Sequence, residues 1–140
     1  MTENESGVPL VGNMVAAGFP SPAEDYLETR IEVEKILIQH PASTFLVRAH
    51  GGSMERAGIF DSDLLVVDKS LEAKNRDVVI AIVDGEFLVK RLIVVLDGGE
   101  GQPRTLLRAE EMGEEEIWPD LVMKEEDVVW GVVKWVLHQV

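Results

Sequence analysis

A serine lies in a glycine-rich turn, Gly51-Gly52-Ser53-Met54, shortly after the apolar run Phe45-Leu46-Val47. Glycines allow positive φ angles and the close approach of another chain. Successive N–H groups in a tight turn can hold a developing negative charge. Ser53 could therefore act as a nucleophile whose neighbouring N–H groups stabilise an oxyanion. An ordinary surface turn is the alternative, because a four-residue motif by itself is only a hypothesis.

A lysine in the segment Gly85-Glu86-Phe87-Leu88-Val89-Lys90-Arg91-Leu92 is the second candidate. If this segment is a strand, alternation places Leu88, Lys90 and Leu92 on one face. Either face of the strand then carries one cation among apolar neighbours. In one interpretation the cation extends along apolar surface to the sheet edge. In the other, Lys90 is buried beside Ser53 and serves as its base.

A lysine base must lose its hydration to work at neutral pH. With a reference pKa near 10.4, about one lysine in 2,500 is neutral at pH 7, a penalty of roughly 4.6 kcal/mol. Burial can lower a lysine pKa to about 5 or 6 and remove that penalty. Cysteine is absent, and His40, His50 and His138 are scattered along the chain. A Ser-Lys pair is therefore the serine-based machinery most easily built from this sequence.

Composition and charge limit the possible partners. The 140 residues suit one core, with 46% hydrophobic and 28% charged residues. The net charge of -13, from 26 acidic and 13 basic residues, argues against direct nucleic-acid binding, because neutralising phosphates dominates that affinity. No apolar run approaches the roughly 18 residues that cross a bilayer, and the first six residues do not resemble a targeting signal. We expect a cytoplasmic protein with no membrane contact, and the scattered histidines predict no metal or other cofactor.

The N-terminal part predicts a mobile arm followed by short helices. Residues 1–20 are rich in glycine, proline and small apolar residues and show no helical or strand period. Ser21-Pro22-Ala23-Glu24 has the pattern of a helix capping box. Apolar spacing within residues 25–31 and 33–39 predicts one or two short amphipathic helices. We therefore divide the chain into a flexible arm, residues 1–20, and one domain, residues 21–140.

From residue 44 onward the pattern changes to period two and to β-branched residues. The expected strands are residues 44–49, 64–68, 78–83, 86–96, 104–109 and 128–137. Asp84-Gly85 predicts a type I′ hairpin between two of them, and the acidic residues 110–116 are expected to form a solvated loop. The predicted fold is mainly β, with short curved antiparallel sheets and one or two N-terminal helices.

A peptide of small apolar residues, Val15-Ala16-Ala17-Gly18, lies within the arm. Such a peptide can occupy a narrow groove as an added strand, although a plain linker is the alternative. Together with the other motifs, this peptide makes the chain resemble the LexA/UmuD family of self-cleaving serine peptidases, most closely the UmuD branch. The resemblance covers nearly the whole chain, and Ser53 and Lys90 are 37 positions apart. The further matching segments are Phe19-Pro20-Ser21-Pro22-Ala23, Leu37-Ile38-Gln39-His40-Pro41, Gly51-Gly52-Ser53-Met54, Asp63-Leu64-Leu65-Val66-Val67-Asp68, Val83-Asp84-Gly85-Glu86-Phe87, Val89-Lys90 and Trp130-Gly131-Val132-Val133.

The resemblance implies a role for each candidate residue and a β fold like that of LexA and the signal peptidases. Ser53 is then the nucleophile, Lys90 the general base, and Ala17-Gly18 the scissile bond of the protein's own arm. The N–H groups of Gly52 and Ser53 would receive the oxyanion. Gly52 is a departure, because the UmuD branch usually has aspartate there. Since that position contributes its N–H and not its side chain, we expect the chemistry to survive.

The resemblance also implies a cellular role. It suggests a bacterial SOS-response homodimer that cuts itself when triggered by the RecA-DNA filament, and whose shortened form joins a translesion DNA polymerase through a UmuC-like subunit. LexA-type repressors carry a DNA-binding domain before the peptidase domain, whereas about 20 residues precede the capping box here, so we do not expect a repressor. A non-catalytic dimeric scaffold or regulatory subunit, binding a polymerase or a transcription partner, remains the alternative.

Overall fold

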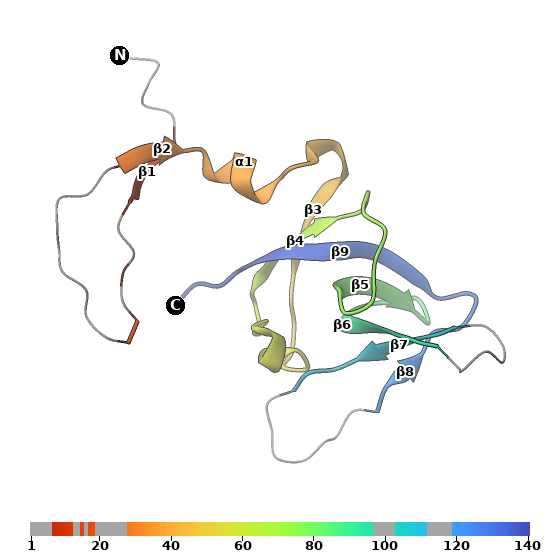
Figure 1. Ribbon diagram of the computed structural model, residues 1–140. Helices are drawn as coiled ribbons and strands as arrows, with labels where there is room; N and C mark the ends of the chain where they lie inside the picture. The colour runs from red at the N-terminus through yellow and green to blue at the C-terminus, as the bar shows by residue number, and fades with distance from the viewer. Residues whose placement is uncertain (1–6, 13–14, 16, 19–27, 97–102, 112–118) are drawn as a thin grey trace. The chain divides into compact units, whose positions relative to one another are not determined.

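The computed structural model describes residues 7–12, 15, 17–18, 28–96, 103–111 and 119–140. It consists of two units, residues 1–39 and residues 40–140. The first unit contains a two-stranded antiparallel sheet and one short helix, and the second contains a seven-stranded antiparallel sheet (Figure 1). The mainly β fold predicted from the sequence is confirmed.

In the N-terminal unit, β1 (Val8–Val11) pairs antiparallel with β2 (Glu28–Ile31), and α1 (Val33–Leu37) follows. The helix predicted for residues 25–31 is wrong from residue 28 onward, because pairing with β1 overrides the helical spacing. Residues 1–20 show no strand period in the sequence, yet residues Val8–Val11 within them form β1. The second predicted helix is confirmed by α1, although it is shorter than residues 33–39. The capping box at residues 21–24 lies outside the described residues.

In the second unit, all strand pairs of the large sheet are antiparallel. The strands lie in the order β3 (Thr44–Arg48), β4 (Leu64–Asp68), β9 (Val128–Leu137), β5 (Val78–Val83), β6 (Glu86–Val95), β7 (Arg104–Arg108) and β8 (Leu121–Val122). Two short 3-10 helices, η2 (Pro41–Ser43) and η3 (Glu55–Ala57), flank β3. The six strands predicted from residue 44 onward are confirmed, with ends correct to within one residue. The two-residue β8 was not predicted because it is too short to show a period.

The hairpin between β5 and β6 has the predicted turn. Val83 pairs with Glu86, and the two residues between them, Asp84 and Gly85, have φ angles of 50° and 78°. Positive φ at both central residues is what a type I′ turn requires. The hairpin therefore fixes the register of β6, which carries Lys90.

Alternation along β5 separates two hydrophobic clusters. Ile80 belongs to the cluster that contains Met54, Ile59 and Leu65, whereas Val79 belongs to a second one with Leu92 and Leu107. Met54 is only 1% exposed. Burying a side chain of this size contributes about 1.5–3 kcal/mol. The residue after Ser53 is thus anchored in the core, and this anchor holds the turn that carries the serine.

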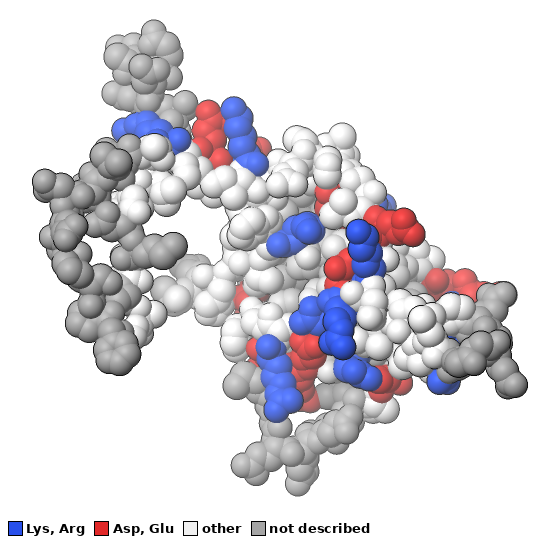
Figure 2. Space-filling model, in the orientation of Figure 1, with Lys and Arg blue, Asp and Glu red and all other residues white. Residues whose placement is uncertain are grey.

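Charged side chains of both signs are mixed on the surface. Figure 2 shows basic and acidic side chains beside one another on one face of the molecule. Among the ion pairs of the second unit are Arg108 with Asp120 at 2.8 Å and Lys124 with Asp84 at 3.0 Å. None of the helices in the described residues has the length and apolar character needed to cross a lipid bilayer.

Candidate active site

The structure brings the side chains of Ser53 and Lys90 into contact. Lys90 Nζ donates a hydrogen bond to Ser53 Oγ over 2.7 Å. Ser53 comes from the turn between β3 and η3, and Lys90 from β6; both residues are partly buried. At the same distance the hydroxyl of Ser53 could donate to a neutral amine, which has a lone pair to accept with. The contact therefore has the geometry that proton transfer requires.

The Ser53 turn is held at its start by a glycine with a positive φ angle and by a carboxylate. Gly51 has φ +89°, and its N–H donates to Asp61 Oδ1 over 2.7 Å. Only glycine adopts this φ without steric cost. A Cβ at Gly51 would meet no other atom within 4 Å, so the requirement for glycine comes from the backbone angle and not from crowding.

On its other side the turn is held by the segment that follows β7. The N–H of Glu110 donates to the carbonyl of Ser53 over 2.7 Å, and the N–H of Arg56 donates to the carbonyl of Glu110 over 2.7 Å. The Glu110 carboxylate accepts hydrogen bonds from Arg91 Nε at 2.9 Å and Arg91 Nη2 at 2.8 Å. Arg91 is the neighbour of Lys90 on β6. Glu110 therefore joins the backbone of the Ser53 turn to β6, the strand that carries Lys90.

Residues 110 and 111 correct the predicted solvated loop. Glu110 is partly buried in its pair with Arg91, and Glu111 Oε2 is buried. The rest of the predicted loop, residues 112–116, lies outside the described residues. Acidic runs usually face solvent, and no local sequence pattern shows that Glu110 lies against Arg91.

The environment of Lys90 favours the neutral amine. Burial lowers the pKa of Lys90, because removing water disfavours the charged form, whereas the negative charge of Glu111 raises it; the net shift is downward. The direction agrees with what a lysine base needs. Within the described residues, no group of three or more histidine, cysteine or carboxylate side chains gathers as a metal site would require.

The N–H groups of Gly52 and Ser53 are the ones expected at the oxyanion position. Among the described residues, neither the N–H of Gly52 nor that of Ser53 donates to a protein acceptor. A Cβ at Gly52 would lie 2.6 Å from Glu55 Oε1. A side chain there would have to displace the Glu55 carboxylate, whereas the backbone N–H would be unchanged.

A cavity of about 310 Å³ lies beside the Ser53–Lys90 contact. It is lined by Val47, Arg48, Ala49, His50, Ser53, Leu65, Ile80, Phe87, Leu88, Val89 and Lys90. On β6, β7 pairs only with Arg91–Val95. Among the described residues no strand occupies that side of residues 86–90. An open strand edge of this kind can accept an added peptide strand.

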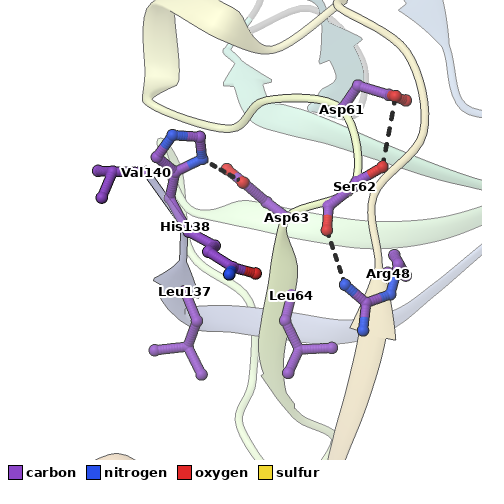
Figure 3. Close-up of a pocket in the computed structure, with 9 residues that line it drawn as sticks. Arg48, Asp61, Ser62, Asp63, Leu64, Leu137, His138 and Val140 are labelled. Atoms are coloured by element: carbon purple, nitrogen blue, oxygen red, sulfur yellow. Dashed lines mark hydrogen bonds and ion pairs between the residues drawn. The ribbon is translucent and has the colours of Figure 1, made fainter.

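Figure 3 shows a larger cavity, of about 560 Å³, lined by Arg48, residues 61–64 and residues 137–140. In it His138 Nδ1 pairs with Asp63 Oδ1 at 2.6 Å, and Arg48 donates to the carbonyl of Ser62 at 2.8 Å. Neither Ser53 nor Lys90 lines this cavity. The candidate chemistry therefore lies in the smaller one.

The other two predicted site residues, Ala17 and Gly18, lie in the N-terminal unit. Both are exposed. Among the described residues, a Cβ at Gly18 would meet no atom within 4 Å.

Comparisons with known proteins identify the family of the chain. A family model described as peptidase S24-like matches residues 9–112. Protein ImpA of Salmonella typhimurium is 39% identical over 133 residues, covering 94% of this chain and 83% of ImpA. Protein MucA of Escherichia coli is 40% identical over 62% of this chain and 60% of MucA. The LexA repressor of Pectobacterium carotovorum subsp. carotovorum is 44% identical over 66% of this chain and 45% of LexA. The chain therefore belongs to the peptidase S24-like family, the LexA/UmuD family of self-cleaving serine peptidases, as a UmuD-like protein of SOS mutagenesis.

Proposed function

We propose that Ser53 and Lys90 are the nucleophile and the general base of a self-cleavage reaction at the Ala17-Gly18 bond. The observation that carries this proposal is the 2.7 Å contact between Lys90 Nζ and Ser53 Oγ. The lowered pKa of Lys90 supports it, because a larger fraction of the amine is then neutral at a given pH.

The reaction follows from these positions. Neutral Lys90 accepts the proton of Ser53, and Oγ bonds to the carbonyl carbon of Ala17. The N–H groups of Gly52 and Ser53 stabilise the resulting oxyanion. The bond to Gly18 then breaks as the Lys90 ammonium returns its proton to the leaving amine. Water hydrolyses the ester and releases a carboxylate at Ala17.

The open edge of β6 supplies a docking position for the arm. An extended peptide around Ala17-Gly18 can add as a strand along residues 86–90, beside the cavity that Ser53 lines. Small side chains suit a shallow position at such an edge. Docking raises the effective concentration of the scissile bond at Ser53. A partner that favours the docked arm can therefore start the reaction without touching the catalytic atoms.

We also propose partners, on the basis of the similarity of the chain to UmuD-like proteins. The protein acts as a homodimer, the RecA-DNA filament promotes docking of the arm, and the shortened form joins a translesion DNA polymerase through a UmuC-like subunit. The net charge of -13 supports contact with DNA through these proteins.

Incubation of the purified protein at alkaline pH tests the reaction. We expect two fragments by mass spectrometry, residues 1–17 and residues 18–140, which form faster as the pH rises through the pKa of Lys90. Gly18→Glu should block cutting and leave the fold intact, because the glutamate does not fit the shallow groove, while position 18 is uncrowded in its own unit.

Lys90→Ala and Ser53→Ala are the matched controls, and each should abolish the fragments. Absence of the fragments from the unmodified protein at every pH, or equal amounts from Lys90→Ala, would leave the non-catalytic dimeric scaffold as the better account.

A further inference from the structure

Glu110 forms hydrogen bonds with three different parts of the candidate active site. Its N–H donates to the carbonyl of Ser53 over 2.7 Å, and its carbonyl accepts from the N–H of Arg56, in η3, over 2.7 Å. Its carboxylate accepts from Arg91 Nε at 2.9 Å and from Arg91 Nη2 at 2.8 Å. A bidentate pair of this kind fixes orientation as well as distance. Glu110 therefore holds the backbone from Ser53 to η3 against β6.

The strand β6 thus reaches Ser53 by two routes. Lys90 Nζ contacts Ser53 Oγ directly at 2.7 Å, whereas the next residue, Arg91, reaches the backbone of Ser53 through Glu110. The direct contact changes during the proposed reaction, because Lys90 takes up the proton and Oγ bonds to the carbonyl carbon. The route through Glu110 includes no reacting atom, so it can hold the turn in place while the direct contact changes.

Arg91 is itself held in a fixed orientation. Besides its two bonds to Glu110, it donates from Nη1 to the carbonyl of Arg76 over 2.9 Å. Directly opposite Arg91 on β7 is Arg108, and like charges in that arrangement are destabilising. Asp120 accepts from Arg108 at 3.0 and 2.8 Å, as Glu110 does from Arg91. Each arginine therefore has a bidentate carboxylate, and the second pair is a comparison for the first.

We propose that the Arg91–Glu110 ion pair positions Ser53 for proton transfer to Lys90. The inference rests on the proposed function, in which Lys90 is the base. The side chains of Arg91 and Glu110 are 27% and 25% exposed, so water screens the pair and its contribution to the stability of the whole fold is modest. Arg91 and Glu110 are positioning residues, because they act through the backbone of Ser53 and touch no reacting atom.

Amide hydrogen exchange tests the positioning without any cleavage. In the Ser53→Ala protein, which cannot cut itself, the amide of residue 110 reports its bond to the backbone carbonyl at position 53. Adding Glu110→Gln or Arg91→Gln should lower the protection of this amide about tenfold. Adding Asp120→Asn, which breaks the comparison pair, should leave the protection unchanged. Full protection in both Glu110→Gln and Arg91→Gln, or an equal loss in Asp120→Asn, overturns the positioning role.

The rate of self-cleavage shows whether this position matters for the reaction. Rates are compared at the alkaline plateau, where Lys90 is neutral, so that a changed charge near the amine does not enter the comparison. Glu110→Gln and Arg91→Gln should each cut about tenfold more slowly, because misplacing a reacting group is costly. The double variant should be no slower than either single variant, because the two residues act as one pair.

Asp120→Asn is the matched control and should cut at the unmodified rate. Urea denaturation should show similar small losses of stability in Asp120→Asn and Glu110→Gln, which separates positioning from folding. An unmodified rate in Glu110→Gln, or losses that multiply in the double variant, overturns the role of the pair. Absence of self-cleavage in the unmodified protein contradicts the proposed function instead, because the exchange of residue 110 needs no cleavage.

Discussion

The reactivity proposed for Ser53 depends on two neighbouring residues with different tasks. Lys90 supplies an amine whose pKa is lowered by burial. Gly51 supplies a backbone angle, φ +89°, that carries the turn past Asp61 and toward β6. The adjacent Gly52 has no such angle. Within the described residues, a Cβ at Gly52 would meet the flexible end of the Glu55 side chain.

These two glycines should therefore respond differently to the same substitution. Gly51→Ala should lower the free energy of unfolding by about 1–2 kcal/mol, because a side chain is strained at this φ, and should slow self-cleavage by misplacing Ser53. Gly52→Ala should change both quantities less, because Glu55 can move. Urea denaturation and the cleavage rate of the two variants measure the difference. A larger loss in Gly52→Ala than in Gly51→Ala would show that crowding, not backbone strain, governs the turn.

Single residues were predictable where a short motif carries them. Ser53 and Lys90 could be named because a glycine turn and a cation within an apolar strand are visible locally, and the structure brings them together. Glu110 and Glu111 could not, because an acidic run has the same pattern whether it faces solvent or two cations. Their environment depends on the path of the chain after β7, where the N–H of Glu110 donates to the carbonyl of Ser53. This is a long-range contact that a local pattern does not show.

At the scale of elements, β6 combines three properties that the site needs. Its hairpin with β5 fixes the register of Lys90, and its second half pairs with β7. Its first half, beside the cavity, has no neighbouring strand on that side within the described residues. The period-two pattern and the Asp84-Gly85 turn made this strand predictable. The four residues of β2 are too few to distinguish a helical period from a strand period, so their spacing predicts a helix. Their partner β1 lies in a segment without a strand period, so the pairing could not be predicted either.

Hydrogen bonds from His40 and Ser43, at the two ends of η2, to Asp68 of β4 predict a loss of stability in acid. Burial raises the pKa of Asp68, but hydrogen bonds from Ser70, His40 and Ser43 outweigh it and hold the pKa far below its usual value. Because the folded-state pKa is depressed, the stabilisation is complete above the unfolded pKa of about 4 and is lost as the pH falls toward the folded pKa.

Asp68→Asn should remove this acid-dependent contribution. Urea denaturation at pH 7 should show a loss of about 1–3 kcal/mol, because donors at Ser70, Ser43 and His40 lose a charged acceptor, and the difference from the unmodified protein should shrink as the pH falls below 4. Asp84→Asn, in the exposed hairpin turn, is the matched control and should change stability little. An unchanged difference between pH 7 and pH 3 would exclude Asp68 as a source of the acid dependence.

At the scale of the whole molecule, the proposed reaction makes one chain both enzyme and substrate. The charge of the chain was predictable from composition, and it directs the expected partners toward proteins and away from nucleic acid. The division into a unit of residues 1–39 and a unit of residues 40–140 was not predicted, because pairing of β1 with β2 joins segments that the sequence pattern treats separately. Partners that bind the first unit could control docking of the arm without altering the Ser53–Lys90 contact.

Covalent labelling of Ser53 measures the central claim independently of the arm. A fluorophosphonate added to the protein over a range of pH values should form one adduct, on Ser53, at a rate that rises as Lys90 becomes neutral. Lys90→Met, which keeps the volume of the side chain without its amine, should label at least a hundredfold more slowly, as expected for loss of a general base. Labelling of Lys90→Met at the rate of the unmodified protein, or an adduct on another residue, would contradict the account.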